Sequence, residues 1–348
     1  MPEELLEQAV EARATDIHLE PSPQSLRIRL RVDGALVSLT TLKQETGQQL
    51  CSRIKVRAGM DIAQRMLPQD GSLHLSCQGQ KWDVRVASQP TVQGEKLVLR
   101  LLPGRPVEQD LTALGMDQST ATAFTRQLRK GQGLVLVTGP TGCGKTTTLY
   151  TAINLLDKER LNIMTLEDPV EYHLPDIVQT QVNYRAGLTF VAGLRGALRQ
   201  DPDVMLVGEI RDAETAAITV RAALTGHLVL ATLHTVNSQA AVARLLDMGC
   251  APYQVASALN GVLAQRLVRI PCGCGGGCKR CLNSGYFGRT GVFELLVMNS
   301  SLRATVQAGK PTPPPHRTLL DDCQAKLEQG LTDEAQYRQM ALSLEEEE

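Results

Sequence analysis

One eight-residue run has the residue types and the spacing needed to hold a phosphate group. Residues 139–146 fit the pattern G-x-x-x-x-G-K-[ST] at every required position. Glycines let backbone N–H groups converge on phosphate oxygens, and the N-terminus of a following helix adds its positive dipole end. Lys145 would then reach the β- and γ-phosphates of a nucleotide, and the Thr146 hydroxyl would ligate Mg²⁺. The predicted nucleotide-binding residues are Gly139, Pro140, Thr141, Gly142, Cys143, Gly144, Lys145, Thr146 and Thr147.

The segments on either side of this run are those that a phosphate-binding loop requires. Residues 134–138 form a short apolar run typical of a buried parallel strand, and residues 147–152 continue without Gly or Pro, as a helix should. The alternative is a glycine turn that binds nothing. Because strand, glycine turn and helix follow one another here, we favour the phosphate loop.

Cys143 occupies a loop position where serine is commoner. One interpretation is a simple isosteric replacement. The other is a thiol whose pKa is lowered by the helix N-terminus, which would make the loop sensitive to oxidation.

Composition narrows the possible classes of protein. The chain has 348 residues, enough for two domains, and its 43% hydrophobic and 21% charged residues are ordinary for a globular protein. A formal net charge of −1 and 3% aromatic residues argue against a nucleic-acid partner. No apolar stretch is long enough to span a bilayer, and the acidic start lacks the layout of a secretion signal. We therefore expect a cytoplasmic protein that reaches a membrane only through a partner.

Residues 1–102 are predicted to form a small α+β domain with an antiparallel sheet. Residues 4–14 carry apolar side chains on one helical face, and residues 26–32 alternate apolar residues with arginine, the two-residue period of a half-buried strand. The pair Asp33-Gly34 predicts a tight turn. Further strands are expected at residues 35–39, 73–77, 82–87 and 96–101.

A second domain is predicted at residues 111–348, after a linker over residues 103–110 that begins with two prolines and a glycine. Apolar runs alternate here with helical stretches, which indicates a parallel sheet with crossover helices. Ligands of such nucleotide-binding α/β folds bind at the carboxyl ends of the strands. The expected strands are residues 134–138, 162–166, 204–207 and 228–232.

Three polar clusters accompany these strands. Residues 166–171 place acidic groups after one strand, where a carboxylate can orient water near a γ-phosphate and accept its proton. Residues 203–209 form an apolar strand ending in an acid, with Gly208 where aspartate is usual. Residues 225–235 carry a histidine at each end of a strand, and His234, at the carboxyl end, could sense a γ-phosphate or a neighbouring subunit. Each cluster alone also fits a solvated loop, a core strand or structural histidines.

Taken in this order, the clusters resemble one family closely. The chain is similar, over nearly its whole length, to the type II secretion and type IV pilus assembly ATPases, a secretion-traffic group of P-loop ATPases. The resemblance implies a RecA-like P-loop domain of α/β class with a parallel-sheet core, preceded by a small α+β, PAS-like domain. The matching stretches are residues 14–21, 31–34, 68–71, 139–146, 167–171, 199–203, 208–212, 225–235 and 263–269.

The resemblance also implies roles for single residues. Glu171 would be the base that activates water, and Glu209 the carboxylate that supports Mg²⁺. Arg85 matches an arginine of the small domain that approaches the phosphates when the two domains close; a solvent-facing strand residue is the alternative. The chain departs from the family pattern at Met66, Ser72 and Val236.

Four of the nine cysteines fall within ten residues, at Cys272, Cys274, Cys278 and Cys281. Their thiolates could surround one Zn²⁺ ion tetrahedrally, in a structural site that leaves no position open for substrate. Assembly-type relatives carry two C-x2-C pairs, whereas the first pair here is one residue short, so a shortened loop of reduced, metal-free thiols is the alternative. The cluster favours an assembly or secretion ATPase over a retraction ATPase, whose relatives do not carry it.

The function implied by the resemblance is Mg²⁺-dependent ATP hydrolysis by a homohexamer. Domain movement would drive an inner-membrane platform protein and so the assembly of pilin or pseudopilin subunits. Longer family members carry a further N-terminal domain, which this chain is expected to lack. Two other functions stay open at this point: a P-loop ATPase that translocates nucleic acid, and an ATP-binding scaffold with little hydrolysis. The low aromatic content speaks against the first, and Glu171 and Glu209 against the second.

Overall fold

The computed structural model describes residues 2–77, 79–103 and 110–347, and the chain divides into two compact units. Unit 1 contains Met1–Pro106 and Pro271–Gly288, and unit 2 contains Val107–Ile270 and Arg289–Glu348. Most of the predicted linker, residues 104–109, lies outside the described residues. The four clustered cysteines belong to unit 1, whereas the sequence places them with the second domain.

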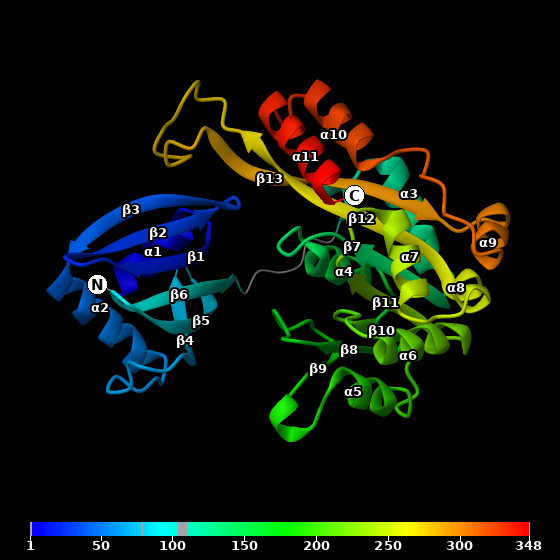
Figure 1. Cartoon of the computed structure of the whole chain (residues 1–348), viewed down its shortest axis with the longest axis horizontal. Helices are drawn as coiled ribbons and strands as arrows, with labels where there is room; N and C mark the ends of the chain where they lie inside the picture. Colours follow the sequence, from blue (N-terminus) through cyan, green and yellow to red (C-terminus); the bar gives the residue numbers. More distant parts are fainter. Residues whose placement is uncertain (1, 78, 104–109, 348) are drawn as a thin grey trace. The chain divides into compact units, whose positions relative to one another are not determined.

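Unit 1 is a six-stranded antiparallel sheet in the order β3-β2-β1-β6-β5-β4, drawn in blue and cyan in Figure 1. Apolar residues of both α1 and α2 pack on the buried face of this sheet. The elements are α1 (Pro2–Glu11), β1 (Ala14–Pro21), β2 (Ser25–Val32), β3 (Ala35–Lys43), α2 (Gln44–Arg57), β4 (Gln69–Cys77), β5 (Gln80–Thr91) and β6 (Gly94–Pro103).

The strands expected in unit 1 are confirmed, but β1 and α2 were not predicted. In β1, Ile17 and Leu19 are fully buried, whereas Glu20 lies on the other face and pairs with Arg29 at 2.6 Å. Hydrogen bonding from Arg29 holds the pKa of Glu20 at about 2. The first helix ends earlier than expected because Ala14 pairs with Val32 in the sheet.

Unit 2 contains a sheet of seven described strands in the order β13-β12-β7-β11-β10-β8-β9, and the run from β12 to β9 is parallel. The four predicted strands are confirmed as β7 (Gly133–Thr138), β8 (Ile163–Glu167), β10 (Val204–Val207) and β11 (Leu228–Leu233). The strands that were not predicted are β9 (Val178–Gln181), β12 (Leu259–Pro271) and β13 (Tyr286–Val297).

Hydrophobic cores cover both faces of this sheet, as crossover connections require. Successive residues of β7 point to opposite faces: Leu134 and Leu136 join one core with helices α5 to α8, and Val135 and Val137 join the other with α3 and α4. The helices of unit 2 are η1 (Thr112–Leu114), α3 (Gln118–Leu128), α4 (Lys145–Asn154), η2 (Tyr184–Ala186), α5 (Phe190–Ala197), α6 (Ala213–Leu224), α7 (Ser238–Asp247), α8 (Pro252–Ala258), α9 (Ser300–Gln307), α10 (Leu319–Glu328) and α11 (Glu334–Glu347).

The chain ends in two helices, α10 and α11, drawn in orange and red in Figure 1. They pack on β12 and β13 through a small core that includes Val268, Val292, Leu319 and Cys323. Among the helices of the described residues, none combines the length and the apolar character needed to cross a lipid bilayer.

Candidate nucleotide site

Neighbouring parallel strands end at one edge of the unit 2 sheet, and each is followed by a segment singled out in the sequence. The phosphate loop follows β7, residues 168–171 follow β8, Glu209 comes just after β10, and His234 comes directly after β11. The strand order β7-β11-β10-β8 places these segments in a row along that edge. The carboxyl edge of such a sheet is where α/β proteins bind their ligands.

Glycines shape the phosphate loop. Gly139, Gly142 and Gly144 have φ angles of +146°, +80° and +90°, which residues with side chains rarely adopt. A Cβ atom at Gly139 would lie 2.4 Å from the backbone oxygen of Gln265, so a side chain does not fit there. Helix α4 begins at Lys145, so its free N–H groups and positive dipole end adjoin the loop. The loop therefore has the form that a phosphate group needs.

Lys145 folds back over this loop. Its Nζ donates to the backbone carbonyls of Gly139 (2.7 Å) and Pro140 (3.0 Å), and the residue is only 9% exposed. Burial lowers the pKa of the Lys145 ammonium, while nearby Glu209 favours its charged form. Phosphate oxygens would offer this ammonium stronger, charged acceptors than the two carbonyls do.

Gln265 of β12 braces the loop, a role that the sequence reasoning missed. Its Nε2 donates to the Cys143 carbonyl (2.8 Å), and its Oε1 accepts from the Thr148 hydroxyl (2.7 Å). All three residues are buried. The parallel pairing of β12 with β7 brings Gln265 to the loop, and β12 was not among the expected strands.

Cys143 lies inside the loop, where it is shielded from solvent. The residue is 4% exposed, and burial raises the pKa of its thiol despite the nearby Lys145 and Arg266. Of the two interpretations of Cys143, this burial favours the isosteric replacement over the acidic, oxidation-prone thiol. The thiol fills the space that a serine hydroxyl would occupy.

Glu209 is surrounded by charged and titratable groups. His234 Nε2 lies 3.6 Å from Glu209 Oε2, and Arg211 both donates to Glu209 and lies 3.6 Å from Asp168 Oδ2. Burial, aided by the charge of Lys145, lowers the pKa of His234, which favours its neutral form at pH 7. The structure thus brings Glu209 and His234 into one group near Lys145.

Gly208 stands where aspartate is usual, at a tightly packed position after β10. A Cβ atom at Gly208 would lie 3.2 Å from both Glu167 Cα and the Leu166 carbonyl oxygen. The Thr232 hydroxyl also donates to the Gly208 carbonyl at 2.6 Å. A side chain at Gly208 would require the neighbouring strand to shift slightly, and the first acid after β10 is Glu209.

Glu171 lies on the loop after β8 and is partly exposed. The ring of the next residue, Tyr172, packs edge-on against Tyr150 of α4. Glu167, by contrast, is the last residue of β8 and is 3% exposed, so it is not part of an exposed acidic turn as the sequence suggested.

Arg85 lies in unit 1, on β5. It pairs across the sheet with Ser72 of β4 and Arg100 of β6, and it is half-buried. Its approach to a nucleotide stays a prediction of the family resemblance.

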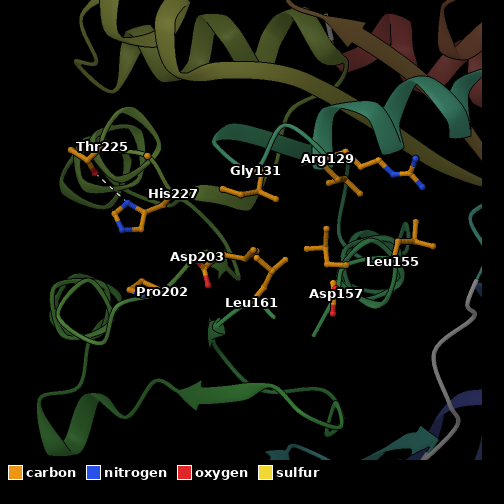
Figure 2. A pocket seen from close by; sticks show the side chains of 14 residues that line it. Arg129, Gly131, Leu155, Asp157, Leu161, Pro202, Asp203, Thr225 and His227 are labelled. Carbon is orange, nitrogen blue, oxygen red and sulfur yellow. Dashed lines mark hydrogen bonds between the residues drawn. The ribbon is translucent and has the colours of Figure 1, made fainter. Parts of the chain in front are cut away.

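A cavity of about 500 Å³ lies at the opposite edge of the unit 2 sheet, where β10 and β11 begin (Figure 2). Its lining includes Asp203 and His227, and His227 Nδ1 lies 3.2 Å from the Thr225 hydroxyl. The cavity is therefore distinct from the nucleotide site. The two histidines of the segment 225–235 are thus separated: His227 belongs to the amino edge and His234 to the carboxyl edge.

The four clustered cysteines have the geometry of a metal site. Their Sγ atoms all lie within 4.8 Å of one another, and three of the pairs are 3.7 or 3.8 Å apart. A tetrahedron with Zn–S bonds of about 2.3 Å has sulfur–sulfur edges of about 3.8 Å. Burial opposes the Cys281 thiolate, but hydrogen bonds from the backbone of Cys278 and Gly285 lower its pKa to about 6. The donor set fits Zn²⁺ despite its unusual spacing.

Contacts with the first domain explain why the cysteine segment belongs to unit 1. Arg13 and Arg280 lie over the ring of Phe287, at 3.4 and 3.8 Å from its centroid. Asp33 Oδ2 accepts from both the Gly288 N–H (2.9 Å) and Arg13 Nη2 (3.0 Å). The contacts of Arg13 with Phe287 and of Asp33 with Gly288 join parts of the chain that are more than 250 residues apart, which sequence patterns cannot reveal.

Comparison with known proteins decides the family. Residues 1–340 match the model of the family described as type II/IV secretion system protein. The chain belongs to this family. It is 49% identical to the type II secretion system protein HxcR of Pseudomonas aeruginosa, over 88% of this chain and 67% of that protein. It is 42% identical to the type II secretion system ATPase E of Vibrio cholerae, over 94% of this chain and 72% of that protein.

The chain spans about two thirds of the length of several relatives. It covers, for example, 66% of the type II secretion system protein E of Dickeya dadantii and is 46% identical to it. Among solved structures, the pilus retraction motor PilT with bound ADP is 26% identical, with a TM-score of 0.69 over 97% of this chain and 96% of that one. The ATPase DotB of Legionella pneumophila shares the fold, at 23% identity and a TM-score of 0.75 over 97% of this chain and 94% of that one. By family and by fold the chain is an ATPase of the secretion type.

Proposed function

We propose that this secretion ATPase hydrolyses ATP with Mg²⁺ and that the energy drives a secretion or pilus-assembly machine. The observation that carries the proposal is the meeting of a phosphate loop, two acidic segments and His234 at the carboxyl edge of one parallel sheet. Bound Mg²⁺ would neutralise charge on the transferred phosphoryl group. The protein contributes binding, orientation and proton transfer.

Each residue of the site has one proposed task. Lys145 binds the phosphates, and the Thr146 hydroxyl and Glu209 would hold Mg²⁺. Glu171 orients the attacking water and accepts its proton, as a carboxylate on a loop beside the phosphates can do. His234, neutral at pH 7 and 3.6 Å from Glu209, responds to the charge of the γ-phosphate.

The machine itself is inferred from the relatives. Several are named as type II secretion proteins, one of them as an ATPase, so we place this chain at the cytoplasmic side of an inner membrane. There it would form a homohexamer, contact a membrane platform protein and power the assembly of pilin or pseudopilin subunits. Arg85 would approach the phosphates as each protomer closes.

The cysteine segment is proposed to hold a structural Zn²⁺ ion. Cys272, Cys274, Cys278 and Cys281 would be its ligands, because three of their sulfur pairs already have the separation of a tetrahedral site and all four atoms lie within 4.8 Å of one another. Four thiolates leave no free coordination position, so the ion would fold the segment and take no part in hydrolysis.

The proposal is tested by phosphate release from ATP and Mg²⁺ by the purified chain. We expect Lys145→Ala to lower kcat at least about 100-fold, because the phosphates lose their buried cation in the transition state. The exposed Lys310→Ala variant is the matched control and should match the wild type. Binding of ATP without release of phosphate by the wild type would favour a scaffold, and full activity of Lys145→Ala would refute the site.

A further inference from the structure

A buried polar network surrounds Glu167 beneath the nucleotide site. Tyr150 of α4 is fully buried, and its hydroxyl donates to Glu167 Oε2. Oε1 accepts from the Thr165 hydroxyl at 2.6 Å and from Gln179 Nε2 at 3.3 Å. A carboxylate that is 3% exposed needs such partners in place of water, and here three side chains supply them.

The network reaches the loop of the candidate base. The Tyr150 hydroxyl, while donating to Glu167, accepts from Gln179 Nε2 at 3.4 Å, and the same Gln179 amide donates to the carbonyl of Tyr172, the residue after Glu171. The ring of Tyr172 stacks edge-on against Tyr150 with centroids 4.6 Å apart and an interplanar angle of 84°. Tyr150 lies on the helix that begins with Lys145, so one side chain links the phosphate loop to the loop of the base.

Glutamines of β9 hold the same loop on both sides of Glu171. Gln181 Oε1 accepts from the Val170 N–H at 3.2 Å. Gln179 donates to the Tyr172 carbonyl at 3.2 Å and accepts from the Leu174 N–H at 2.7 Å. The backbone around Glu171 is therefore fixed to the edge strand as well as to α4.

We infer that Tyr150 and Gln179 are positioning residues that hold the Glu171 loop at a set distance from the phosphate loop. This inference rests on the proposed role of Glu171. A base that must meet one water molecule beside the γ-phosphate loses rate when its backbone is free to move, because small misplacements are costly in proton transfer. Among the described residues, the side chains of Tyr150 and Gln179 form no hydrogen bond with the phosphate loop. They would therefore act through the Glu171 loop.

Tyr150→Phe tests the inference, because it removes the hydroxyl and keeps the ring against Tyr172. We expect kcat for ATP to fall about tenfold, in line with the loss of a hydrogen bond to a charged group, while KM and the affinity for ATP stay unchanged. Gln179→Met, which removes the amide at similar length, should show the same separation of kcat from KM. The exposed Tyr253→Phe on α8 makes the same chemical change elsewhere and should match the wild type.

For each variant, kcat and KM are compared with the free energy of unfolding measured in urea. Wild-type kcat in both Tyr150→Phe and Gln179→Met would overturn the inference, and so would a kcat loss that merely follows the loss of folded protein. A rise in KM equal to the fall in kcat would also overturn it, because it would indicate weakened binding. Glu171→Gln separates the positioning role from the proposed base. Normal turnover by Glu171→Gln refutes the proposed base, whereas normal turnover by both Tyr150→Phe and Gln179→Met beside an inactive Glu171→Gln refutes only the positioning role.

Discussion

Burial disfavours the charged form of both titratable side chains in the phosphate loop, with different consequences. It lowers the pKa of Lys145 and raises the pKa of Cys143. The negative oxygens of a nucleotide phosphate would stabilise the Lys145 ammonium in place of the water that burial removes. At Cys143 burial outweighs the nearby charges of Lys145 and Arg266, which favour a thiolate, so we assign this residue a packing role.

This difference predicts the response of the enzyme to oxidants. The Cys143→Ser variant and the wild type should lose the same fraction of activity in dilute hydrogen peroxide, because a buried neutral thiol reacts slowly. Phosphate release is measured before and after treatment. Clear protection by the serine substitution would contradict the structural assignment of Cys143.

Single residues were predictable where a local motif required them and not where distant strands met. The loop residues 139–146 follow from their spacing alone. Three features depend on strands or helices that lie side by side but are far apart in the sequence. They are the tight packing at Gly208, the hydrogen bonds of Gln265 to the phosphate loop and the network around Tyr150. A single sequence carries no sign of such pairs.

At the scale of elements, the predictable strands are those with a simple pattern. β2 alternates apolar residues with arginine, and β7, β10 and β11 are continuous apolar runs buried between helices. β12 was missed because it buries Gln265 and Arg266, polar side chains that find their partners only in the folded protein. β9 is short and partly exposed, so it has no apolar signal.

The cysteine segment supports a prediction about metal content. The purified chain should contain about one zinc ion, and Cys281→Ser should reduce this to near zero, because three thiolates and a hydroxyl bind zinc far more weakly than four thiolates. Elemental analysis by mass spectrometry measures it, with buried Cys250→Ser of unit 2 as the control that keeps the metal. Zinc-free wild-type protein, purified without chelator, would contradict the proposed site.

Metal loss should also weaken unit 1. The segment packs there through Phe287 and Asp33, and Trp82, the single tryptophan of the chain, is buried in the same unit. A chelator is therefore expected to lower the urea midpoint reported by tryptophan fluorescence in the wild type but not in Cys281→Ser.

At the scale of the whole molecule, the sequence predicted an antiparallel domain followed by a parallel one, but not every segment that belongs to each. The antiparallel sheet of unit 1 and the parallel sheet of unit 2 follow from alternation and from apolar runs, respectively. The chain crosses between units again at residues 270–271 and 288–289, where the cysteine segment leaves unit 2 and returns to it. Long-range contacts such as that of Gly288 with Asp33 decide this division.

The central claim is that Glu171 activates water at a nucleotide held by the phosphate loop. The most direct measurement compares phosphate release and ATP affinity for the wild type, Glu171→Gln and the exposed control Glu159→Gln, all with Mg²⁺. We predict that Glu171→Gln binds ATP as the wild type does while kcat falls at least about 100-fold, the usual contribution of a general base. Wild-type turnover by Glu171→Gln would contradict the account.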